Sequence, residues 1–421
     1  MEVYKFGGAS IATPERMRAV LPILALADGP LVVVMSALGK TTNALEAVVA
    51  AACCGQKKEA GALATDLENT HMAYAAALLP NLAGSTIEEA LAPFFTELHW
   101  AIDEAEPTRY DYHYDQMVPV GELLSTRLFS LLLEEQVVKH RWFDARDLIR
   151  TDDTYRDARV DTDVTNAAIR STMLPILHED ANLILTQGFI GSTPDNASVT
   201  LGREGSDYTA ALIASAISAT RVTIWKDVEG LLNADPKLFP DTEMIQRANF
   251  SEVIEMAFYG AQVIHPKTIK PLQNAGIPLH VRSFLHPEGV GTCICAEKGD
   301  IRYPPILVLK DRQVLLQLTT RDFSFITEKA LSRIYHTLSE HRAKVNLIQN
   351  AAITFVACID FRQDRMPALV AAFEEEYRVT RNEGVTLLTI RHPQTDLVEK
   401  HTSGKKILLE QRTRQTVQLV F

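Results

Sequence analysis

The first apolar run of the chain ends in Lys5-Phe6-Gly7-Gly8 and leads directly into a segment that is predicted to be helical. At such a turn, free backbone amides and the helix dipole favour an anion, and glycines let the backbone approach it closely. A phosphate group is therefore a candidate ligand for Lys5, Gly7 and Gly8. A tight strand-to-helix turn beside a surface lysine would give the same letters, because paired glycines are a weak signal.

The segment Gly202–Asp207, with the sequence GREGSD, opens a second predicted helix. Arg203 can hold a carboxylate through two parallel hydrogen bonds, and the amides of Gly205 and Ser206 suit developing negative charge. Asp207 could position a nucleophile or a metal. Structural turns rarely need arginine, glycine, serine and aspartate together, so this segment is the clearest candidate for a binding site.

Two further helix starts carry candidate ligands. Glu122 stands in the first turn of an apolar helix, where it could receive a substrate ammonium or simply complement the helix dipole. The segment Gly39–Asn43 offers hydroxyls, including that of Thr42, to a carboxylate or phosphate, or caps its own helix. It is not a P-loop, because Val34 stands where that pattern requires glycine.

A polar turn follows the strand-like run Arg221–Trp225. It contains Lys226 and Asp227 and, further on, Asp235 and Lys237. These charges could contact a nucleotide, or they could be solvated loop charges. His265, before Pro266, is more typical of a packed structural histidine than of a base.

Composition excludes several classes of protein. The formal net charge of −11, from 42 basic and 53 acidic residues, argues against a nucleic acid as partner. No apolar run reaches the roughly 18 residues that a membrane span requires, and no signal peptide is visible at the N-terminus. None of the five cysteines forms a CxxC pair, which is typical of free thiols in a reducing cytoplasm and gives no indication of a metal site.

The elements that must position these residues alternate between strand and helix over the first 300 residues. Apolar strands are predicted at Val3–Phe6, Leu31–Ser36, Trp142–Ala145, Leu183–Gly188, Arg221–Trp225 and Pro278–Arg282, with helices between them. Strands this apolar predict a mostly parallel sheet covered by helices on both faces, an α/β fold.

The pattern changes after Glu297–Ile306, where charges and two prolines interrupt the chain. Residues 314–381 read as β-α-β-β-α-β, the order of a ferredoxin-like fold. The tail is predicted to hold strands at Val385–Arg391, Lys406–Gln411 and Thr416–Phe421, without helices.

With these motifs in order, the chain resembles the aspartate kinases (aspartokinases) of the amino-acid kinase superfamily. The resemblance covers residues 1–295 and is carried by Lys5–Gly8, Ser36–Asn43, Gly121-Glu122, Gly188–Gly191, Gly202–Tyr208, Lys226–Val228 and His265-Pro266. The remainder resembles that family's paired ACT regulatory domains. The implied domains are a kinase domain at 1–298, an inserted ACT domain at 312–382, and a second, truncated ACT domain without helices at 304–311 plus 383–421.

The resemblance implies transfer of the ATP γ-phosphoryl group to the β-carboxylate of L-aspartate, the first step towards lysine, threonine and methionine. Catalysis would rest on Lys5, which stabilises the phosphoryl group in flight, and on Asp207, which keeps Lys5 in place. Aspartate would be bound by Glu122 at its ammonium and by Arg203 at its α-carboxylate, and it would be oriented by Thr42 and Ser206. No metal ligands from the protein are implied.

The nucleotide, with Mg²⁺ on its phosphates, would contact Gly7, Gly8, Lys226, Asp227, Leu232, Asp235, Lys237 and Gln262. The chain departs from the family pattern here, because Gln262 replaces a lysine and Leu232 replaces a tyrosine beside the adenine. A third departure is Glu204, where the family has glycine. The first two departures favour an alternative, a catalytically impaired amino-acid sensor. A smaller alternative is a kinase for another amino acid or carbamate.

The ACT-like part implies an amino-acid effector and a homodimer formed through these domains. Lysine-sensitive relatives carry an acidic residue where this chain has Asn346. A neutral amide binds an ammonium less well than a carboxylate does, so the sequence leaves inhibition by lysine open.

Overall fold

The computed structural model describes residues 1–179, 183–261, 264–296 and 301–421. The chain divides into two compact units. The first comprises Met1–Leu231, Met244–Ile254 and Val263–Ile301, and the second comprises Leu232–Glu243, Glu255–Gln262 and Arg302–Phe421. No described helix is long and apolar enough to cross a membrane.

The first unit is built on an eight-stranded sheet with the order β10-β12-β11-β7-β1-β2-β4-β3. Its neighbouring strands are parallel, apart from the antiparallel pair of β11 and β12. The strands are β1 (Glu2–Phe6), β2 (Leu31–Met35), β3 (Arg141–Phe143), β4 (Leu183–Gln187), β7 (Arg221–Lys226), β10 (Arg247–Asn249), β11 (Leu279–Ser283) and β12 (Thr292–Cys295). All six predicted strands are therefore present, and the mostly parallel α/β sheet is confirmed.

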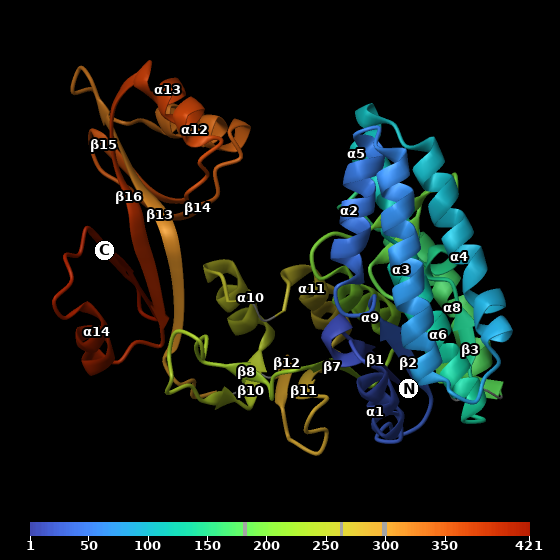
Figure 1. Ribbon diagram of the computed structural model, residues 1–421. Helices are drawn as coiled ribbons and strands as arrows, with labels where there is room; N and C mark the ends of the chain where they lie inside the picture. The colour runs from blue at the N-terminus through green and yellow to red at the C-terminus, as the bar shows by residue number, and fades with distance from the viewer. Residues whose placement is uncertain (180–182, 262–263, 297–300) are drawn as a thin grey trace. The chain divides into compact units, whose positions relative to one another are not determined.

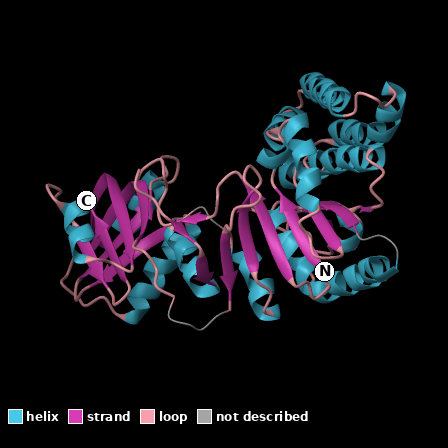
Figure 2. Ribbon diagram, turned by 90° about the horizontal axis from the view of Figure 1, so that it is seen from below, coloured by secondary structure: helices cyan, strands magenta, loops and turns pink. Residues whose placement is uncertain are grey.

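Helices cover both faces of this sheet (Figure 2). Four of them, α2, α3, α4 and α5, stand side by side (Figure 1). The helices are η1 (Gly8–Ile11), α1 (Pro14–Leu24), α2 (Thr41–Cys53), α3 (Lys57–Leu78), α4 (Gly84–Glu104), η2 (Pro107–Arg109), α5 (Tyr110–Met117), α6 (Val120–Glu135), α7 (Ala145–Leu148), α8 (Thr162–Glu179), α9 (Gly205–Ala216) and α11 (Pro266–Ala275). A small hairpin of β5 (Ile190–Ser192) and β6 (Ser198–Thr200) precedes α9. Helix α10 (Phe250–Tyr259) and strand β8 (Leu231–Leu232) contain residues of both units, and β9 spans Met244–Ile245.

The central strand β1 is held by side chains that contact its neighbours. Phe6 stacks on Trp225 of β7 at a centroid distance of 6.1 Å, and Tyr4 meets the same indole edge-on at 5.5 Å. All three rings are fully buried. Burial of aromatic rings on this scale is a large part of the stability of a core. It fixes β1 between β2 and β7.

The second unit contains a six-stranded sheet with the order β14-β15-β13-β16-β18-β17. Its elements are β13 (Ile306–Thr320), α12 (Glu328–Glu340), β14 (Val345–Asn350), β15 (Thr354–Asp360), α13 (Met366–Glu374), β16 (Tyr377–Arg391), α14 (Thr395–Thr402), β17 (Leu409–Arg412) and β18 (Thr416–Val420). The order β14-β15-β13-β16 is that of the predicted ferredoxin-like fold. Helices α12 and α13 bury Ile334 and Phe373 against one face of this sheet.

One expectation for this unit is wrong, because its tail has a helix, α14. Only Leu397 and Val398 are apolar in these eight residues, too few to produce a helical period in the sequence. Val398 is buried in a cluster that includes Leu388 and Leu419, and this packing stabilises a helix too short to form alone. Helix α14 lies near one end of the long strands β13 and β16, and α12 and α13 lie near the other (Figure 1).

The first residues of β13 pair with a strand of the C-terminal tail. Ile306–Lys310, at the start of β13, pairs with Leu387–Arg391 of β16. Beyond a register shift after Lys310, the rest of β13 pairs with the first half of the same strand. The last predicted strand of the segment 314–381 and the predicted strand Val385–Arg391 are thus one continuous strand, β16.

Candidate active site

A cavity of about 500 Å³ opens in the first unit where β1, β2 and β7 end and α9 begins. Seven of the predicted site residues line it: Lys5, Thr42, Glu122, Arg203, Ser206, Asp207 and Lys226. These residues come from segments up to 221 positions apart in the chain (226 − 5). The parallel sheet brings them together because the carboxyl ends of its strands meet at one edge.

Two lysines converge on one buried aspartate at the centre of the site. Lys5 Nζ lies 2.6 Å from Asp207 Oδ1, and Lys226 Nζ lies 3.8 Å from Oδ2. Burial by itself would raise the pKa of Asp207, but the charges of Lys5 and Lys226 outweigh it and hold this pKa below its usual value. The aspartate therefore stays ionised, between two lysine side chains that can attract an anion.

The strand register explains how Lys5 reaches this position. On β1, Lys5 pairs with Val34 of β2 and Ile224 of β7, so it stands one residue before the end of a central strand. Only 11% of its side chain is exposed. A lysine so deeply placed pairs with a carboxylate or loses its charge. Asp207, in the first turn of α9, is that partner.

Glu122 is buried and has one oxygen to spare. Its Oε1 accepts a hydrogen bond of 3.2 Å from the N–H of Ala37, whereas Oε2 has no hydrogen-bond partner among the described residues. Burial raises the pKa of Glu122 to about 8, and the N–H of Ala37 and the charge of Lys5 offset this only in part. An ammonium placed at Oε2 would satisfy the orphan oxygen and favour the charged form.

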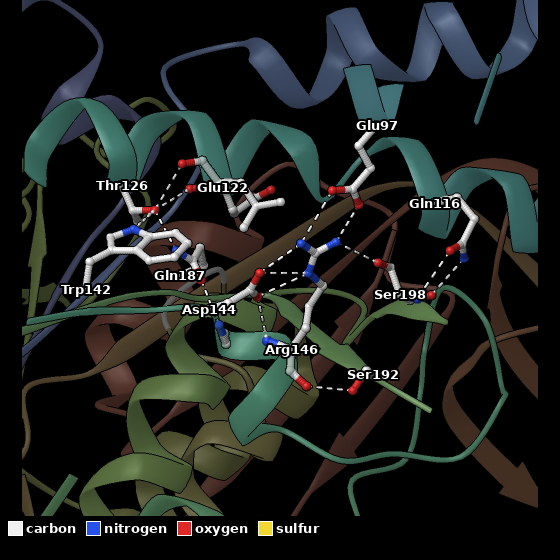
Figure 3. Close-up of polar contacts among 12 residues, drawn as sticks. Glu97, Gln116, Glu122, Thr126, Trp142, Asp144, Arg146, Gln187, Ser192 and Ser198 are labelled. Atoms are coloured by element: carbon white, nitrogen blue, oxygen red, sulfur yellow. Dashed lines mark hydrogen bonds and ion pairs between the residues drawn. The ribbon is translucent and has the colours of Figure 1, made fainter. Parts of the chain in front are cut away.

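A polar network holds the helix that carries Glu122 (Figure 3). Thr126 Oγ1 donates to the carbonyl oxygen of Glu122 at 3.0 Å. The same hydroxyl accepts from Gln187 Nε2 at 2.7 Å and from Trp142 Nε1 at 3.0 Å. Gln187 Oε1 in turn accepts the N–H of Ala145 at 2.8 Å. The network joins α6 to β4 and to the start of α7, and so links the helix of Glu122 to the sheet.

Hydroxyl groups complete the wall beside Asp207. Ser36 Oγ donates to Ser206 Oγ at 2.9 Å, which links the end of β2 to the first turn of α9. Thr42, in the first turn of α2, lines the same cavity. Both predicted hydroxyl residues are thus beside the lysine cluster, where they can orient a bound substrate.

The departure at Glu204 is accommodated by the backbone and by a neighbour. Glu204 has a left-handed φ of 54°, a conformation that glycine adopts more readily. Its Oε2 accepts the N–H of His265 at 2.7 Å, and this bond helps hold the side chain. The neighbouring Arg203 is exposed and makes no hydrogen bond or ion pair with the described residues, so its guanidinium is available to a ligand.

Gly8 has a packing role that the sequence did not indicate. Neither Gly7 nor Gly8 is among the described residues that line the cavity. A Cβ on Gly8 would lie 2.7 Å from the carbonyl oxygen of Ala37, and Gly8 accepts a hydrogen bond from the N–H of Gly39. The second glycine lets two loops of the site touch. Contact of either glycine with phosphate stays a prediction.

The other predicted nucleotide-binding residues are divided between the two units, apart from one that the structure does not describe. Asp227 is exposed and directly follows Lys226 at the end of β7. Leu232, Asp235 and Lys237 lie in the second unit, so their part in nucleotide binding stays a prediction. Gln262 lies outside the described residues.

Comparison with known proteins identifies the family. A model of the amino acid kinase family matches residues 1–283. The lysine-sensitive aspartokinase 3 of Escherichia coli is 34% identical over 362 residues, which are 85% of this chain and 78% of that protein. The chain belongs to the aspartokinases of the amino acid kinase family. An aspartokinase of Chlamydia pneumoniae is 31% identical over 356 residues, covering 84% of this chain and 77% of its own.

Solved structures agree with this assignment. E. coli aspartokinase III, in complex with aspartate and ADP, superposes with a TM-score of 0.82 at 30% identity, covering 100% of this chain and 96% of that one. The same protein with lysine and aspartate bound gives 0.81 at 29% identity, again covering 100% and 96%. The aspartokinase resemblance and the fold of a kinase domain followed by ACT-type domains are confirmed.

Sequence reasoning missed three residues that line the cavity, Tyr114, Arg156 and Thr200. Tyr114 and Arg156 stand in polar stretches without glycine or an apolar period. Thr200 precedes the GREGSD segment by only two positions, and that closeness was the one signal available.

Proposed function

We propose that this protein transfers the γ-phosphoryl group of ATP to the β-carboxylate of L-aspartate, giving 4-phospho-L-aspartate. The observation that carries the proposal is one cavity in which Lys5 and Lys226 flank Asp207, with Glu122 and Arg203 in its wall. Its relative from E. coli was solved with aspartate and ADP together. Mg²⁺ belongs to the ATP substrate in this proposal and is bound by its phosphate oxygens.

The chemical difficulty is that two anions must approach in line. Positioning and neutralisation of charge therefore supply most of the catalysis. In our proposal Lys5 meets the phosphoryl group in flight, and Asp207 fixes Lys5 by their 2.6 Å ion pair. Lys226 neutralises the phosphates from the neighbouring strand.

L-Aspartate, the acceptor, would be held at its ammonium and at its α-carboxylate. Glu122 Oε2, buried and unsatisfied, receives the ammonium, and the available guanidinium of Arg203 takes the α-carboxylate. Ser206 and Thr42 orient the β-carboxylate towards the phosphoryl group. Gly7, Gly8, Asp227, Leu232, Asp235, Lys237 and Gln262 remain the proposed nucleotide contacts.

Substitution of Arg203 tests the arrangement of the acceptor. Arg203→Ala should raise the KM for aspartate much more than the KM for ATP, since the change removes the carboxylate clamp. Initial rates with each substrate varied in turn measure both values. Equal effects on the two substrates would place Arg203 on the nucleotide.

We propose the domain limits 1–298 for the kinase domain, 312–382 for one ACT domain, and 304–311 plus 383–421 for the other. An amino-acid effector and pairing of two chains are assigned to these ACT domains. None of the five cysteines, all of which the structure describes, forms a disulfide, which fits a reducing cytoplasm. Size-exclusion chromatography with light scattering tests the expected homodimer.

A further inference from the structure

A second arginine, Arg156, lines the cavity together with Arg203. It stands in the loop between α7 and α8, and its side chain is 46% exposed. Nothing in the proposed mechanism uses it. Three features of its surroundings indicate that neighbouring residues hold Arg156 in this position.

The backbone at Arg156 adopts a conformation that is unusual for its type. Its φ is 69°, in the left-handed region that residues other than glycine seldom occupy. Asp115 holds it there, because Oδ2 of this fully buried carboxylate accepts the N–H of Arg156 at 2.8 Å. Backbone strain of this kind concentrates at functional sites, where surrounding structure maintains it.

The same carboxylate fixes the strand that leads to Arg203. Asp115 also accepts the N–H of Thr200 at 3.0 Å and its hydroxyl at 2.7 Å. The N–H of Ala158 donates to the carbonyl oxygen of Thr200 at 3.0 Å. A Cβ at Gly202 would lie only 3.2 Å from the carbonyl oxygen of Arg156. The backbones that carry the two arginines therefore run side by side.

The guanidinium of Arg156 is held in a defined place. Its Nη1 lies 3.2 Å from Asp111 Oδ1, and its Cζ lies 4.4 Å from the centroid of the Tyr114 ring. Tyr114 also lines the cavity, and its hydroxyl donates to Glu46 Oε1 at 3.0 Å. A guanidinium has five N–H donors, so the contact with Asp111 leaves donors for a ligand. Because the guanidinium already stacks on an aromatic face, the arginine side chain loses less conformational entropy when a ligand binds.

We propose that Arg156 is a second binding residue for the α-carboxylate of the amino-acid acceptor and shares that carboxylate with Arg203. This inference rests on the proposed function. The acceptor is favoured over the nucleotide because Arg156 neighbours Thr200 and Gly202, whereas the cations around Asp207 come from β1 and β7. The α-carboxylate is favoured over the β-carboxylate because two guanidinium groups on the reacting carboxylate would weaken it as a nucleophile.

Arg156→Gly gives the sharpest test, because glycine keeps the backbone N–H and accepts the left-handed φ without strain. The variant should melt at or above the temperature of the parent. Its KM for aspartate should rise roughly tenfold, as expected for loss of one charge-assisted hydrogen bond. The KM for ATP and kcat should stay within about twofold, since the contact is made equally in ground and transition states. Arg159→Gln, an exposed arginine of the same loop that does not line the cavity, is the matched control and should change none of these values.

The double variant Arg156→Gly/Arg203→Ala tests whether the two arginines bind the same carboxylate or act independently. Two arginines on one carboxylate should give a KM for aspartate below the product of the single effects. The inference would be wrong if the double variant multiplied the two single effects. It would also be wrong if a folded Arg156→Gly changed only the KM for ATP or left the KM for aspartate unchanged. Each of these results would leave the proposed function intact. A parent protein without aspartate-dependent turnover would overturn the proposed function itself, and the inference with it.

Discussion

The carboxyl group of Glu122 links the affinity for aspartate to pH. Burial raises its pKa to about 8, so in the free site it is mostly neutral at pH 7. A bound ammonium favours the charged form and lowers the pKa, so binding releases a proton and affinity rises with pH up to about 8.

The KM for aspartate should therefore fall by up to about tenfold per pH unit between pH 6 and 7.5, as linkage to one proton requires. Initial rates at fixed saturating ATP across this range measure it. Glu122→Gln should bind aspartate weakly and show a flat profile. A Gln variant that kept the pH dependence of the parent would assign the proton to another group.

Loss of Lys5 should remove turnover far more than binding. Lys5→Met is expected to lower kcat by roughly 100-fold or more, because the ammonium meets charge that develops in the transition state. It also leaves Asp207 buried with Lys226 as its remaining ion-pair partner among the described residues, so the melting temperature should fall. Circular dichroism at the assay temperature establishes that the variant is folded. A kcat above about a tenth of the parent value would remove the role assigned to Lys5.

At the scale of single residues, the sequence indicated which residues would lie in the cavity better than it indicated the contacts that they make. Lys5, Glu122 and Asp207 were recognisable because their types and motifs suit the chemistry. The backbone packing of Gly8 and the position of Arg156 were not predictable. Both depend on which loops meet in space, and neither residue type nor spacing encodes that.

At the scale of elements, Arg146 ties four segments together (Figure 3). Its guanidinium bonds Asp144 at 2.8 Å, pairs with Glu97 of α4, and reaches Ser198 Oγ of β6 at 3.2 Å. Its carbonyl oxygen accepts the hydroxyl of Ser192 in β5 at 2.6 Å. This arginine therefore anchors the hairpin that precedes Arg203.

Arg146→Gln should lower the free energy of unfolding by about 1–3 kcal/mol, the range for breaking a partly buried, hydrogen-bonded ion pair. Urea unfolding measures the change. The matched control is Arg127→Gln, whose partner Glu134 is 52% exposed, and there the change should stay below about 1 kcal/mol. Equal losses in the two variants would show that the Arg146 network adds no more than a surface ion pair.

Elements were predictable where apolar periodicity was long. The six predicted strands of the first unit and both helices of the ferredoxin-like part follow from uninterrupted patterns. Short elements were missed. Helix α5 buries His113, Tyr114 and Asp115, polar or amphipathic residues that give no apolar period, and α14 depends on packing in its sheet. Tertiary contacts stabilise both helices, so sequence pattern alone could not reveal them.

At the scale of the whole molecule, the contacts within the second unit bear on the proposed regulation by an amino acid. Asn346 is engaged within the unit, because its Oδ1 accepts Lys310 Nζ at 2.7 Å. Its Nδ2 donates to Gln313 Oε1 at 2.7 Å and to Asp360 Oδ1 at 2.6 Å. Burial and the charge of Lys344 lower the pKa of Lys310. The chain's own ammonium thus occupies the amide oxygen that the ammonium of the proposed effector would need.

Free lysine should therefore inhibit this protein much less than it inhibits the lysine-sensitive aspartokinase of E. coli. Activity of both proteins, measured side by side over the same range of lysine concentration, provides the comparison and its control. Half-inhibition of both at similar concentrations would contradict the prediction. The domain order was predictable from sequence, but this internal contact was not, since Lys310 and Asn346 lie 36 positions apart on different strands.

Phosphoryl transfer to the β-carboxylate of aspartate can be tested directly by trapping the product. The protein is incubated with ATP, Mg²⁺, L-aspartate and hydroxylamine, which converts an acyl phosphate into a hydroxamate. We predict that β-aspartyl hydroxamate forms in proportion to the ADP released, only when aspartate is present, and not with Lys5→Met. Release of ADP without hydroxamate would contradict phosphoryl transfer to aspartate, and equal formation of hydroxamate by the Lys5 variant would contradict the role of Lys5.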